Sequence, residues 1–61
     1  MKNDRTDFRI WFWHRARLVK VEVNAPAEAN AIEYARHEFM ERFGYWPGNP
    51  HQVDRYTPGM T

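Results

Sequence analysis

The feature that most constrains the fold is a strict alternation of residue types in two stretches, FRIWFW at residues 8–13 and LVKVEV at residues 18–23. β-Branched or aromatic residues recur at every second position in both stretches, a pattern that is typical of β-strands. Only the four residues HRAR separate them, so the sequence predicts a β-hairpin. Because HRAR lacks the Gly or Asn of a two-residue primed turn, we expect a four-residue loop over residues 14–17, built on a type I turn.

A loop at residues 14–17 also fixes which residues of the hairpin lie opposite each other. The phenylalanines, the isoleucine and the valines then share one face, and the other face collects two tryptophans and several charged side chains. A slip of one residue would turn the valines to the wrong face. The predicted pairs are Phe8–Val23, Arg9–Glu22, Ile10–Val21, Trp11–Lys20, Phe12–Val19 and Trp13–Leu18.

An amphipathic helix is predicted over residues 26–43. Pro26 suits a first helical turn, Glu28 suits the positive end of the helix dipole, and Gly44 is a natural stop. The helix is long enough to cover the phenylalanine and valine face of the hairpin. The side expected to be buried consists of Ala29, Ile32, Ala35, Phe39, Met40 and Phe43.

Residues 51–56, HQVDRY, form either a short third strand with Val53 facing the core or a loop. We expect one α+β domain over residues 1–61, a two-layer ββα(β) arrangement with one helix on a two- or three-stranded sheet. A third strand beside the first gives the order 2-1-3. Residues 1–7 and 57–61 are expected to fray.

A chain of 61 residues buries only about 60% of the surface exposed by its unfolded state. Cysteine is absent, so the stability depends on three Trp, three Tyr and four Phe. The polar start MKNDRTD and the lack of a long apolar run predict a cytoplasmic protein with no membrane segment.

Catalysis is not expected. The sequence contains no serine and no cysteine, which leaves three threonines and the tyrosines as hydroxyl nucleophiles. Glu33, His37 and Glu41 follow each other at spacings of four, but two carboxylates and one imidazole on a single helix make an incomplete metal site. We interpret them as a solvated helix face and expect no catalytic residue, no metal and no cofactor.

The sheet face that the helix leaves free is the candidate site. Trp and Arg dominate binding energy at many interfaces, and exposed apolar area usually marks a contact surface. An alternative is that Tyr45, Trp46 and Tyr56 fold back over the two tryptophans. The candidate partner-binding residues, on this face and at the hairpin tip, are Arg9, Trp11, Trp13, Arg15, Arg17 and Lys20.

Two kinds of partner fit this surface. The net charge of +1 and the presence of Glu22 favour a larger protein, and the basic residues 1–23 against the acidic residues 24–43 indicate an oriented partner. The alternative is nucleic acid, stacked on the basic aromatic hairpin face. A homodimer is also open, because strand two is an unpaired edge in the order 2-1-3.

The segment VKVEVNAPAEANAIEYARHEF, residues 19–39, resembles a strand-to-helix junction of small proteins encoded by phages and mobile elements. Several anti-CRISPR proteins have this size and hairpin-plus-helix build, although Ala-Pro stands here where a Ser or Asp cap is usual. The resemblance implies a non-catalytic inhibitor or modulator that occludes a host or defence protein in the host cytoplasm. The matching residues are Val21, Val23, Ala25, Glu28, Ala29 and Ala35.

Overall fold

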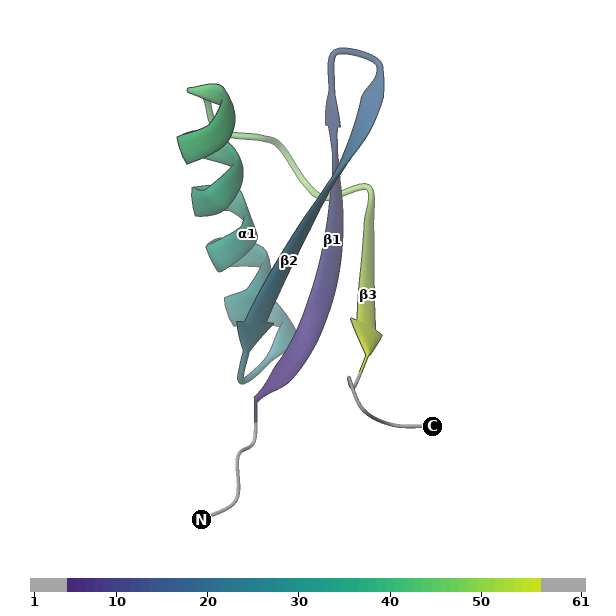
Figure 1. Cartoon of the computed structure of the whole chain (residues 1–61), viewed down its shortest axis with the longest axis vertical. Coiled ribbons are helices and arrows are strands. Elements are labelled where there is room, and N and C mark those ends of the chain that lie inside the picture. The colour runs from purple at the N-terminus through teal and green to yellow at the C-terminus, as the bar shows by residue number, and fades with distance from the viewer. Residues whose placement is uncertain (1–4, 57–61) are drawn as a thin grey trace.

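The computed structural model describes residues 5–56, which form a three-stranded sheet with one helix. The elements follow in the order β1 (Thr6–His14), β2 (Arg17–Ala25), α1 (Glu28–Phe43) and β3 (Gln52–Tyr56). Both neighbours of β1 run antiparallel to it, the strand order is β2-β1-β3, and α1 lies on one face of the sheet (Figure 1). The predicted α+β fold, its strand order and the third strand are therefore confirmed.

The hairpin has the predicted register but a different turn. Every predicted pair from Phe8–Val23 to Trp13–Leu18 is present, and the ladder continues to His14–Arg17. The prediction of a four-residue loop is therefore wrong, because only Arg15 and Ala16 connect the strands. Their φ angles of 51° and 64° lie in the left-handed region, as a type I′ turn requires. This region costs about 1–2 kcal/mol per non-glycine residue. Type I′ geometry nevertheless matches the right-handed twist of the two nine-residue strands that it joins.

The core lies between the hairpin and the helix. The predicted buried side of α1 is correct at Ala35 and Phe39, and Ile32 and Phe43 pack partly buried against the core. Ala29, however, is exposed, and Ala31 is buried in its place. The reason is that Ala31, Ala35 and Phe39 follow at spacings of four, which aligns them along one line of the helix. The fully buried residues are Phe8, Ile10, Phe12, Val21, Ala25, Ala31, Ala35 and Phe39.

The helix begins two residues later than predicted and ends where predicted. Ala27 is the N-cap and has no side-chain hydrogen bond, so Pro26 lies in the approach to the helix. At the other end Gly44 has a φ of 84°, and its N–H donates a hydrogen bond of 2.7 Å to the carbonyl of Met40. α1, the one helix among residues 5–56, lacks the length and the apolar character needed to cross a membrane.

β1 is paired with β2 from its first residue, Thr6, and with β3 from Asp7. Val53 is opposite Ile10 and packs against the core, as predicted. The prediction that residues 1–7 fray is wrong for residues 5–7, because Thr6 and Asp7 belong to β1 and the Arg5 guanidinium donates to the carbonyl of Asn24. The remaining residues predicted to fray, 1–4 and 57–61, lie outside the described residues.

Candidate functional site

Side chains alternate along each strand, so the sheet has two faces of different composition. One carries Phe8, Ile10 and Phe12 and is covered by α1. No helix or strand of residues 5–56 covers the other, which we call the open face. By register, the open face carries Asp7, Arg9, Trp11 and Trp13 from β1, Leu18, Lys20, Glu22 and Asn24 from β2, and Gln52 and Asp54 from β3.

The apolar part of the open face lies near the hairpin turn. Trp13 and Leu18 are opposite each other and leave 54% and 41% of their surface exposed. The indole Nε1 of Trp13 donates a hydrogen bond of 3.3 Å to His51 Nδ1, and the two rings meet edge to face with centroids 5.4 Å apart. His51 thus fixes the orientation of the Trp13 ring without covering it. A side chain that is already ordered loses less entropy when it is buried against a partner.

Trp11 has a different role on the same face. It is half-buried, and its indole Nε1 is buried without a hydrogen-bond partner in the described part of the chain. A buried donor without an acceptor costs about 1–3 kcal/mol. Trp11 therefore offers less exposed surface to a partner than Trp13 does.

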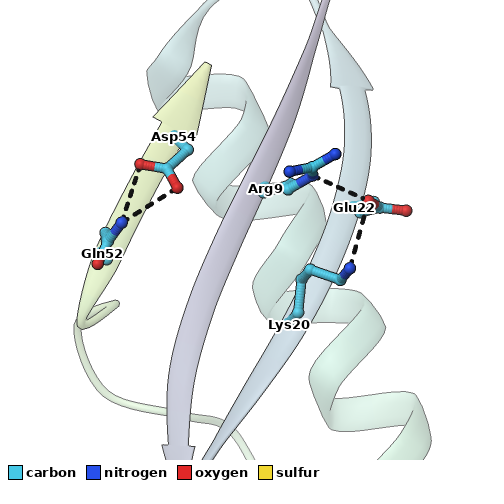
Figure 2. Close-up of polar contacts among 5 residues, drawn as sticks. All are labelled: Arg9, Lys20, Glu22, Gln52 and Asp54. Carbon is cyan, nitrogen blue, oxygen red and sulfur yellow. Dashed lines mark hydrogen bonds and ion pairs between the residues drawn. The ribbon is translucent and has the colours of Figure 1, made fainter. Parts of the chain in front are cut away.

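Charged side chains of both signs cross the middle of the open face. Arg9 has Glu22 opposite it on β2 and Asp54 opposite it on β3. Figure 2 shows Arg9 turned towards β2, where its Nε donates a hydrogen bond of 3.1 Å to Glu22 Oε2. The ammonium of Lys20 is 3.8 Å from the same oxygen. Such exposed pairs contribute only about 0–1 kcal/mol each, so their main effect is to orient the side chains.

The open face is not basic, although the sequence predicts a basic hairpin. Gln52 donates hydrogen bonds of 3.0 Å to both carboxylate oxygens of Asp54, which fixes this acid beside Arg9 (Figure 2). Asp7 adds a further acid and accepts a hydrogen bond of 2.7 Å from the Asn24 amide. The acids are Asp7, Glu22 and Asp54, and the bases are Arg9 and Lys20.

The predicted site residues do not all lie together. Arg9, Trp11, Trp13 and Lys20 share the open face, and Arg15 is exposed in the turn. Arg17 pairs with His14 and so belongs by alternation to the helix side of the sheet. Sequence reasoning missed Leu18, His51 and Asp54. Leu18 could have been found from its predicted pairing with Trp13, whereas the positions of His51 and Asp54 depend on the pairing of residues 51–56 with the first strand, which the sequence left open.

The alternative in which aromatic residues fold back over the tryptophans is wrong for Tyr45 and Trp46. Tyr45 packs edge to face on Phe39, with centroids 5.2 Å apart, and its hydroxyl shares a hydrogen bond of 2.7 Å with His14 Nδ1. Trp46 packs edge to face on His37 of α1 at 4.8 Å. Both side chains therefore pack against α1 and not on the tryptophans of the open face. The prediction for the Tyr56 side chain falls outside the described residues.

The helix residues weighed as metal ligands have other neighbours. Glu33 is 4.0 Å from Arg36, and His37 contacts Trp46. No three histidine or acidic side chains among residues 5–56 gather to hold a metal ion, and the same residues form no pocket. The candidate site is accordingly an exposed face of the sheet.

Comparison of the chain with protein-family models, with curated proteins and with solved structures gives no match. The functional interpretation therefore rests on the open face itself.

Proposed function

We propose that this protein is a non-catalytic protein-binding module and that the open face is its contact surface. The observation that carries the proposal is the exposed pair of Trp13 and Leu18 on the face that α1 leaves uncovered. A tryptophan buries about 150–250 Å² in full, so burying the exposed 54% of Trp13 contributes roughly 2–4 kcal/mol. Trp13 is thus the anchor of the interface, and Leu18 extends its apolar area.

The charges around the anchor orient the partner. Arg9, Lys20 and Glu22 lie together beside Trp11, so a matching protein surface carries both signs in a defined arrangement. Complementary charges of this kind select the partner and its orientation more than they add affinity. Glu22 and Asp54 on the same face would repel the phosphate backbone of a nucleic acid, and this supports a protein partner over nucleic acid. The nucleic-acid alternative would use Trp13 and the bases of the same face, with Arg15 exposed in the turn, against these two acids.

We extend the proposal to inhibition or modulation by steric occlusion. The resemblance of residues 19–39 to anti-CRISPR and related phage proteins supports this extension. The partner would then be a host or defence protein, and the location would be the host cytoplasm. Occlusion needs only an anchored surface such as the open face.

Affinity capture with the full chain as bait separates the two kinds of partner. A protein partner is expected to be retained after nuclease treatment, and its dissociation constant to change by less than about tenfold between 50 and 200 mM salt. Nucleic-acid binding through 6–10 phosphate contacts would weaken by about 10³–10⁵ over the same range. Capture that nuclease abolishes, with a steep salt dependence, would contradict the proposal.

A further inference from the structure

The free edge of β2 is a second surface of the protein, and its backbone geometry indicates which kind of strand can pair with it. β2 is nine residues long and is the outer strand of the sheet. The two-residue turn makes His14–Arg17 a hydrogen-bonded pair, so the odd-numbered residues of β2 exchange hydrogen bonds with β1. The even-numbered residues therefore turn their N–H and C=O groups outward. Arg5 bonds the outward carbonyl of Asn24, and no strand of residues 5–56 pairs with this edge.

The sequence of β2 is self-complementary about Val21. When two copies align antiparallel and centred on this residue, Lys20 of each lies opposite Glu22 of the other. Val21 then faces its own copy, and Val19 faces Val23 on the helix side of the sheet. The central valines form a non-hydrogen-bonded pair and the charged residues a hydrogen-bonded pair, which matches the outward groups of the edge.

Charge selects this register over its neighbours. A shift of the second copy by two residues in one direction brings Lys20 opposite Lys20, and a shift in the other direction brings Glu22 opposite Glu22. Like charges directly opposite each other destabilise a pair of strands. A shift by one residue turns the valines towards the open face. Of these registers, only the one centred on Val21 gives both opposite charges and a continuous row of valines.

We propose that the protein forms a two-fold symmetric homodimer in which the β2 strands of two copies pair antiparallel about Val21. Glu22 then lies between Arg9 of its own copy, the contact drawn in Figure 2, and Lys20 of the second copy. Val19 and Val23, which are half-buried in the single chain, gain a neighbour across the interface. Both open faces lie on the same side of the joined sheet. The dimer does not depend on the proposed function, because it uses the strand edge and not Trp13.

Charge-swap variants of the full chain test the dimer by sedimentation equilibrium up to about 1 mM protein. Lys20→Glu and Glu22→Lys each convert two attractive pairs into two repulsive ones, so each is expected to weaken self-association by about tenfold or more. An equimolar mixture of the two variants restores opposite charges in the heterodimer, and the double variant restores them in the homodimer. Both are expected to associate as the unmodified chain does.

Trp13→Ala is the control for the interface, and circular dichroism of every variant is the control for folding. Trp13→Ala is expected to leave the association unchanged. A chain that is monomeric at about 1 mM would overturn the proposal. So would single variants that associate normally, a mixture that fails to recover, or a dimer that depends on Trp13.

Discussion

Replacing Phe39 with Ala is expected to unfold the domain. Phe39 is completely buried, and its ring lies edge to face with Phe12 at 5.4 Å and with Tyr45 at 5.2 Å. It therefore joins the helix to β1 and to the segment after the helix. Truncating a core phenylalanine costs about 3–5 kcal/mol, while a chain of 61 residues has a total stability of about 3–9 kcal/mol. Far-ultraviolet circular dichroism and urea titration measure the loss directly.

The matched control for Phe39→Ala is Tyr34→Ala, which removes an exposed aromatic ring from the same helix. Tyr34 leaves 43% of its surface exposed, so its replacement is expected to change the free energy of unfolding by no more than about 0.5 kcal/mol. If Phe39→Ala cost as little as Tyr34→Ala, the core described here would be incorrect.

Replacing Trp13 with Ala is expected to reduce affinity for the partner protein by about 30-fold or more while the domain stays folded. A well-placed interface tryptophan contributes 2 kcal/mol or more, and the orientation fixed by His51 favours such a role for Trp13. The fold survives because Trp13 lies on the open face, outside the buried core. Titration of the captured partner gives the affinity, and circular dichroism verifies the fold.

Trp46→Ala is the matched control for Trp13→Ala. Trp46 exposes 49% of its surface, close to the 54% of Trp13, but it packs on His37 of the helix. Removing it is expected to change affinity by less than about threefold, as for most residues outside a binding hot spot. Equal losses in the two variants would mean that general aromatic exposure, and not the open face, governs binding.

The hairpin register could be predicted because the position of the connection fixes which residues lie opposite each other, and the period-two pattern then places all three valines of the second strand on the core side. The turn could not, because type I′ geometry normally requires Gly or Asn and here the strand twist imposes it on Arg15 and Ala16. The helix was located by its proline and glycine signals. The prediction of its buried side was wrong in the first turn, where Ala31 is buried in place of Ala29.

The surface chemistry was harder to predict because it depends on contacts between distant segments. The open face looked basic from residues 1–23 alone, and only the pairing of β3 with β1 brings Asp54 beside Arg9. Tyr45 and Trp46 pack against α1 because the left-handed Gly44 turns the chain back on the helix, and Pro47 is buried after them. The sequence left the pairing open, because residues 51–56 fit either a strand or a loop, and the reversal after Gly44 has no local signal that predicts its direction.

Hydroxyl-radical footprinting of the full chain, free and bound to its partner, tests the role of the open face most directly. We expect binding to protect Trp13 and Leu18 from oxidation, while Trp46 and Tyr34 react as they do in the free protein. Protection of Trp46 and Tyr34 with Trp13 unchanged would contradict the account and move the interface to the helix.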